Sequence, residues 1–284
     1  MQSARVSTSS DYIEISPTSK EQVSSAGFMK YITAIARNTF RESVRDRILY
    51  NLVLFVLLIT AAAIFLGELT AGKEARTIVN FGLSAMLLFG AFIAIFVGVA
   101  LVSKEIEKRT IYAIFSKPVG RAEFIIGKYF GLCLTLLVNV VIMGVGVSLA
   151  LLYVGGGNLA LTIWGAIYLI YLELAILTAI ATLFSSFSSP ALSALLTFFI
   201  FIIGHFSASL RDFAANLDSN AAKAFFEFLY YFLPNLSFFS FINNAANNDV
   251  PSASIITGAT AYAFVYIGIT IAATVLIFSR RNFK

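Results

Sequence analysis

The sequence predicts an all-α integral membrane protein with six transmembrane helices. The composition is about 59% hydrophobic and only 12% charged, whereas soluble domains carry roughly 25% charged residues. The apolar residues stand in long single runs, which indicates helices rather than alternating strands. Besides the spans, we expect an amphipathic helix at the N-terminal end, a charged segment between spans two and three, and an aromatic segment before span six.

The N-terminal part divides in two. Residues 1–26 are rich in Ser, Thr and Gln, lack the apolar core of a signal peptide, and predict a disordered cytosolic tail. Residues 28–49 predict an amphipathic helix lying at the cytoplasmic membrane surface. Its apolar stripe repeats every four residues, and its basic ridge lies on another face. The alternative is a solvated extension of the first span. The stripe is Ile32, Ala36, Phe40, Val44 and Ile48, and the ridge is Arg37, Arg41 and Arg45.

The rest of the chain, residues 27–284, reads as one transmembrane domain. The six spans are expected at about 48–66, 78–102, 124–154, 163–187, 191–206 and 257–278. Gly90, Ala94 and Gly98 put small residues on one face of the second span, and Gly127 and Gly131 do so where the third begins. Such faces permit close helix contact, although small residues are also common in membrane helices generally.

Residues 103–131 form the longest charged interval between apolar runs. A helix is expected from Lys104 to Phe115, followed by a break at 117–120 and a second helix that resumes near Ala122. A charged helix-turn-helix between two spans is suited to being held and moved by a partner.

An aromatic segment, 225–241, precedes the last span and is interrupted by Pro234 and Asn235. It is too short to span a bilayer, which predicts a helix in the outer interface or a re-entrant segment. The whole interval from Ser207 to Pro251 is expected outside the cytoplasm.

The basic residues orient the chain. Sixteen of the twenty Lys and Arg residues fall on the side that holds both termini and the charged interval. The other side has Lys73, Arg76, Arg211 and Lys223. By the positive-inside rule both termini lie in the cytoplasm, which predicts a multi-pass protein of the plasma (inner) membrane.

Three motifs resemble the ABC-2 type permeases, and most closely the subgroup described as multi-copper enzyme maturation permeases. They are residues 116–124 with 127–129 (SKPVGRAEF and GKY), residues 183–190 (LFSSFSSP) and residues 232–236 (FLPNL). The resemblance extends from about Phe28 to Phe283 and is specific for no substrate.

The resemblance implies a permease that pairs as a dimer, with itself or a paralogue, and binds cytosolic ATP-binding cassette subunits that carry ATP and Mg²⁺. Residues between spans two and three would form a coupling helix seated in the ATPase. The candidate coupling residues are Glu105, Glu107, Arg109, Lys117, Pro118, Gly120, Arg121 and Glu123.

The chain shows no ATP site, catalytic cluster or cofactor site of its own. Residues 120–128 superficially resemble a P-loop, but the glycine spacing is wrong and Tyr129 stands where Ser or Thr would bind Mg²⁺. The single histidine, His205, has no Cys, Asp or Glu near it in the sequence and predicts no metal site. Cys133 reads as a packing residue, and nothing indicates nucleic acid as a partner.

Two polar residues within spans are the transport-pathway candidates. Glu173 is the one acid well inside a span, where a carboxylate is costly. It either faces the dimer interior or pairs with Tyr or Asn on a neighbouring helix. Its role is either direct contact with a substrate or ion or a structural hydrogen bond. Asn139 is expected to bond between helices.

The leading hypothesis is therefore the permease subunit of an ATP-driven exporter. The alternatives are a secondary transporter, which would show repeated halves and paired broken helices, and a non-transporting anchor or sensor. The apolar spans suit a lipid-like cargo but do not identify it.

Overall fold

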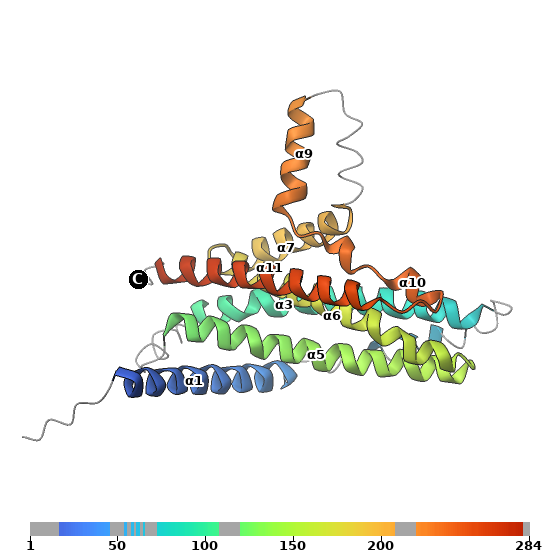
Figure 1. Ribbon diagram of the computed structural model, residues 1–284, viewed down its shortest axis with the longest axis horizontal. Helices are drawn as coiled ribbons and strands as arrows, with labels where there is room; N and C mark the ends of the chain where they lie inside the picture. Colours follow the sequence, from blue (N-terminus) through green and yellow to red (C-terminus); the bar gives the residue numbers. More distant parts are fainter. Residues whose placement is uncertain are drawn as a thin grey trace, which may run out of the picture.

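The computed structural model is an elongated bundle of helices (Figure 1). It describes residues 17–45, 54–55, 58–59, 61–62, 65, 73–107, 120–207 and 220–280. Every element in these ranges is helical. The first expected span, 48–66, lies mostly outside them; its described residues are helical, and Phe55 and Ile59 are buried.

The described residues contain five long helices and several short ones. They are α1 (Pro17–Arg45), α3 (Glu74–Glu107), α5 (Arg121–Tyr153), α6 (Gly157–Ser185), α7 (Pro190–His205), α9 (Asn220–Phe232), η1 (Leu236–Phe239), α10 (Ile242–Ala246) and α11 (Ala253–Arg280). Within the described residues, α3, α5, α6 and α11 are the four helices long and apolar enough to cross a membrane. The expected count of six spans stays a prediction.

Helix α6 is the centre of the bundle. It packs against α3, α5, α7, α10, α11 and η1, and most of its residues are buried. Two glycines of α3 permit the close approach of α6: a Cβ at Gly90 would lie 2.5 Å from Leu174 Cδ1, and one at Gly98 would lie 2.7 Å from Ala181 Cβ. The small-residue face expected at Gly90, Ala94 and Gly98 is therefore a helix-packing surface.

Helices α3, α5 and α6 alternate in direction, and α11 runs antiparallel to α5 and parallel to α6. Ser185, at the end of α6, donates a hydrogen bond to the carbonyl of Val99 near the end of α3. Arg121, at the start of α5, donates to the carbonyls of Phe278 and Ser279 at the end of α11. The turn between α5 and α6 lies at the opposite end, where Gly156 contacts Ala75.

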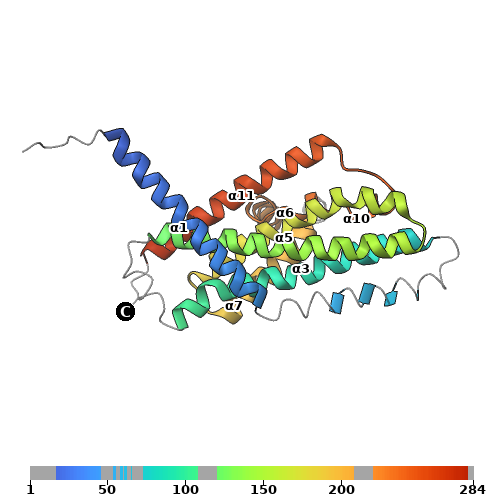
Figure 2. The same cartoon turned by 90° about the horizontal axis from the view of Figure 1, so that it is seen from below.

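Helix α1 differs from the expected interfacial helix in its start and in its contacts. It begins at Pro17, so residues 17–26 are helical and not a disordered tail. Proline is favoured at the first position of a helix, a positional signal that the Ser, Thr and Gln content of this segment does not reveal. Figure 2 shows α1 crossing the bundle obliquely. It packs on α5, where a Cβ at Gly131 would lie 2.6 Å from Ala36 O.

The packed face of α1 is shifted from the expected stripe. Thr39 and Ser43 are its buried residues, and Ile32, Ile35, Ala36 and Phe40 are half-buried. The period is closer to 3.6 than to four, as the helix geometry requires. Arg37 and Arg41 are exposed, as expected of the basic ridge.

Helix α7 is shorter than the full crossing expected at 191–206. Its 16 residues reach about 24 Å, short of a ~30 Å hydrocarbon core. It ends beside the middle of α6, and Gly204 there packs against Leu236 of η1. The chain returns to this level at Pro234, and η1 and α10 continue along α6.

The segment 207–251 is thus only partly outside the bundle. Helix α9 projects sideways near the end of α7 (Figure 1), with Phe225 and Phe228 exposed. In contrast, Leu236 and Phe239 of η1 are buried among α6 and α11. The aromatic segment breaks at Pro234 and Asn235 as expected, but its second half is core. Aromatic density alone does not separate these two environments.

Candidate functional site

The candidate site lies where α7 stops against α6. Glu173 comes from α6, and its neighbours Leu174 and Leu172 are buried in the apolar core. Only 1% of Glu173 is exposed. A carboxyl group at this depth needs partners, because burial without them is costly.

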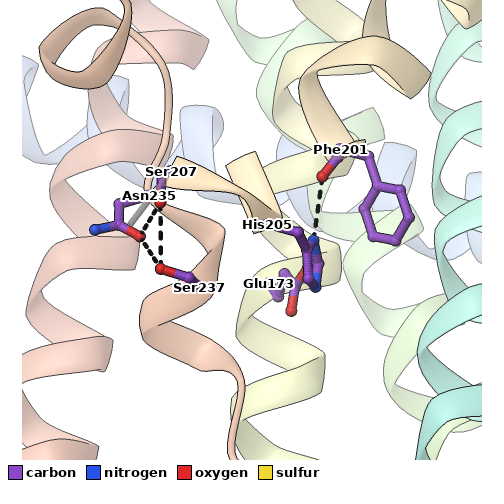
Figure 3. A network of polar contacts seen from close by, with 6 residues as sticks. All are labelled: Glu173, Phe201, His205, Ser207, Asn235 and Ser237. Carbon is purple, nitrogen blue, oxygen red and sulfur yellow. Dashed lines mark hydrogen bonds and ion pairs between the residues drawn. The ribbon is translucent and has the colours of Figure 1, made fainter. Parts of the chain in front are cut away.

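His205 is the side chain that reaches Glu173. The last residue of α7, it places Nε2 3.4 Å from Glu173 Oε1 (Figure 3). Its other ring nitrogen, Nδ1, lies 3.1 Å from the carbonyl oxygen of Phe201, and its ring packs edge-on against the Phe201 ring. Glu173 thus pairs with a histidine, and not with the Tyr or Asn expected.

The contact between the two side chains is close but not a hydrogen bond. Its 3.4 Å length is within ion-pair range, yet both Glu173 oxygens and His205 Nε2 lack a hydrogen-bonding partner among the described residues. The ion-pair distance and the missing hydrogen bond agree if the contact is electrostatic and its geometry does not satisfy a hydrogen bond. The site therefore keeps three polar atoms with unused bonding capacity.

Next to this pair, a network of hydroxyl and amide groups connects the end of α7 to the start of η1. This meeting point is called the joint below. Ser207 and Ser237 each donate a hydrogen bond to Asn235 Oδ1 at 2.6 Å (Figure 3). The backbone N–H of Asn235 donates to the Tyr262 hydroxyl of α11 at 3.0 Å. Irregular backbone within an apolar bundle requires such partners. Asn235 therefore ties the end of α7, η1 and α11 together.

The candidate coupling residues are only partly described. Arg109, Lys117 and Pro118 lie outside the described residues, and Glu105 and Glu107 belong to the end of α3. Glu123 accepts a hydrogen bond from the Gly120 N–H at 3.0 Å, which caps α5. Arg121 binds the last carbonyls of α11, where a cation is favoured. Both residues thus have structural contacts besides any role in coupling.

The comparison with protein families decides which family this bundle represents. The model of the ABC-2 family transporter protein matches residues 33–283. The chain belongs to the ABC-2 transporter family. No curated protein matches the sequence. The match shows the family and assigns no subgroup within it.

The motifs that resembled this ABC-2 family have visible structural roles. In LFSSFSSP, Ser185 bonds to α3, Ser188 bonds to Ser193, and Pro190 begins α7. In FLPNL, Pro234 and Leu236 pack on Gly204, and Asn235 forms the network described above. The two motifs therefore hold the two ends of α7.

Asn139 does not join the site. Its Nδ2 donates to the Thr135 carbonyl of its own helix at 2.7 Å, and its Oδ1 has no partner among the described residues. Among the described residues Asn139 makes no interhelical bond, so the bond expected from the sequence stays a prediction. Tyr129 of α5 bonds to Ala175 O of α6, and Tyr171 of α6 bonds to Cys133 O of α5. Glu173 therefore lies level with the part of α5 between Tyr129 and Cys133. Asn139 lies further along α5, beyond both.

His205 is the functional candidate that the sequence analysis did not select. No acid stands near it in the sequence, and the fold supplies one from 32 positions away. The signal available was the length of the apolar run, which is too short to cross and ends at Gly204-His205. In the described part of the chain no three His, Cys, Asp or Glu residues cluster as for a metal.

Proposed function

We propose that the chain is the permease subunit of an ATP-driven exporter, coupled to a separate cytosolic ATP-binding cassette subunit. The observation that carries this is the family match over residues 33–283. The permease works as a pair, with a second copy or a paralogue. Subgroup membership and a lipid-like cargo rest on the motifs and the apolar spans, and the described residues include no ATP-binding motif.

The arrangement of helices supports a mechanical coupling route. Helix α3 continues without a break through Glu107, and α5 begins at Arg121. Both helices pack on α6. Because packed helices move as rigid bodies, a partner that grips residues 104–123 displaces the helices that flank α6.

Arg121 also brings α11 into this route. Its guanidinium bonds to the end of α11, and Phe124 stacks on Phe278 with ring centroids 6.2 Å apart. The start of α5 and the end of α11 therefore move together. Movement at the coupling segment reaches α11 without passing through α6.

A secondary transporter is the second candidate, because the broken crossing at Glu173 and His205 resembles the midplane sites of that class. The family match weighs against it. The two candidates differ in whether transport needs ATP hydrolysis by a partner.

The test is copurification with a soluble protein that carries a Walker A motif and is encoded beside the gene. We expect the complex to hydrolyse ATP and the permease alone not to. Arg109→Ala and Lys117→Ala should lower the ATPase rate of the complex severalfold. The matched control is Arg76→Ala, an exposed residue at the other end of the bundle. Hydrolysis by the isolated permease, or transport that persists without the partner, would refute the proposal.

A further inference from the structure

The carbonyl group next to Nδ1 determines which ring nitrogen of His205 carries the hydrogen. A backbone carbonyl oxygen only accepts hydrogen bonds, so the contact of Nδ1 with Phe201 O requires the hydrogen on Nδ1. In a neutral imidazole the other nitrogen, Nε2, is then an acceptor. It is this acceptor that faces the Glu173 carboxyl group.

An ionised Glu173 is also an acceptor only, so the two facing atoms would both lack a hydrogen. At 3.4 Å, in a site where Glu173 is 1% exposed, neither atom has another partner among the described residues. One proton placed on either His205 Nε2 or the Glu173 carboxylate removes this conflict between two acceptors. It makes either an imidazolium that donates to the carboxylate or a carboxyl group that donates to Nε2.

Among the described residues, His205 is the charged or titratable side chain paired with Glu173. Helices α3, η1 and α10 bring only apolar and neutral polar side chains to this level of α6. The Tyr129 and Tyr171 hydroxyls donate to backbone carbonyls, and Lys128 lies 5.1 Å from the Phe124 ring centroid. Helix α11 contributes Tyr262, whose hydroxyl accepts from Asn235, and Tyr266, which stacks on it.

We propose that Glu173 and His205 form a proton-binding site inside the membrane domain, and that one shared proton holds α7 against α6. The C-terminal end of α7, where His205 lies, favours a positive charge. A proton needs no cavity, whereas a metal ion would need ligands beyond these two. This proposal goes beyond the permease assignment and requires nothing of the ATPase.

The site controls the joint of the broken crossing. Loss of the proton leaves two acceptors in contact and weakens the attachment of α7 to α6. The end of α7 also carries Gly204 on Leu236 and Ser207 on Asn235. Loosening α7 therefore loosens η1, so the joint is firm at low pH and loosens as the pH rises through loss of the shared proton.

The chain contains a single histidine, which permits a direct test. The permease is purified with a tag free of histidine, labelled with ¹⁵N-histidine and placed in lipid nanodiscs. Nitrogen NMR then reports His205 alone. We expect a hydrogen on Nδ1 at all pH values and one titration step at Nε2. In Glu173→Gln the side-chain amide donates to Nε2 in place of the proton, so that step should disappear.

Thermal unfolding across pH provides the second measurement. The unfolding constant of the wild type should rise with pH more steeply than that of Glu173→Gln. The difference should be up to about tenfold per pH unit, the limit for one linked proton. Glu123→Gln is the matched control, because its carboxyl group lies at the exposed end of α5. It should leave the Nε2 step unchanged.

Three results would overturn the proposal. The first is an Nε2 titration that is the same in wild type and Glu173→Gln. The second is a hydrogen on Nε2 with Nδ1 bare. The third is a shift of the Nε2 signal and a rise in melting temperature on adding Zn²⁺, because the pair would then be a metal site. The labelled wild type decides the last two even if the variant fails to fold.

Discussion

At the scale of single residues, glycines determine how closely the helices approach. Gly127 and Gly131 of α5 face α1, and Gly90 and Gly98 of α3 face α6. Each would place a Cβ within 3.0 Å of an atom on the neighbouring helix. The backbones therefore lie in near contact, which is how membrane helices gain packing energy where burial from water contributes little.

Gly131→Ala should separate α1 from α5. The new Cβ would lie 2.6 Å from Ala36 O and 2.7 Å from Thr39 Cβ, and a backbone atom cannot move aside without shifting α1. We expect destabilisation of about 1–3 kcal/mol, measured as a lower melting temperature in detergent. The control is Gly268→Ala on α11, where a Cβ meets nothing within 4 Å. Equal melting of the two variants would contradict this packing.

At the scale of elements, the broken crossing is the feature that distinguishes this bundle. Helix α7 stops at His205 and η1 begins at Leu236. Hydrogen bonds among Ser207, Asn235 and Ser237 hold the end of α7 to the start of η1. Apolar packing of Leu236 and Phe239 on α6 buries the joint, so its polar groups depend on each other and not on water.

Asn235→Ala should weaken that joint. It removes the acceptor for both serine hydroxyls and leaves them only their 3.2 Å contact with each other, and loss of a buried hydrogen-bonding partner costs about 1–3 kcal/mol. Amide hydrogen exchange should speed up at residues 202–207 and 236–240 and stay unchanged in α5. Asn247→Ala, which removes one bond to Asn243 O at an exposed position, should change neither. Uniform exchange across the bundle would mean a global rather than local effect.

At the scale of the whole molecule, the directions of the helices place each connection at one end or the other of the bundle. Ser185 and Val99 meet at one end, as do Arg121 and Ser279. Gly156 and Ala75 meet at the other. The charged interval and the end of α11 therefore share a side, in agreement with the positive-inside count.

Reporter fusions test this arrangement. A reporter after Gly120 should be active on the cytoplasmic side, and one after Gly156 on the far side, because these positions lie at opposite ends of α5. Expression of each fusion is the control for an inactive reporter. Activity of both on the same side would be incompatible with α5 as a span.

The sequence by itself determined the class of protein, the long spans and the breaks. Apolar runs, Pro190, the glycines at 155–157 and the proline at 234 are local signals, and α3, α5, α6 and α11 lie close to the ranges expected from them. Only the tertiary structure decided that α7 ends at mid-bundle, that η1 is core, and that His205 meets Glu173. These are contacts between residues distant in the chain, and a local pattern of hydrophobicity carries no information about which polar side chains packing brings together.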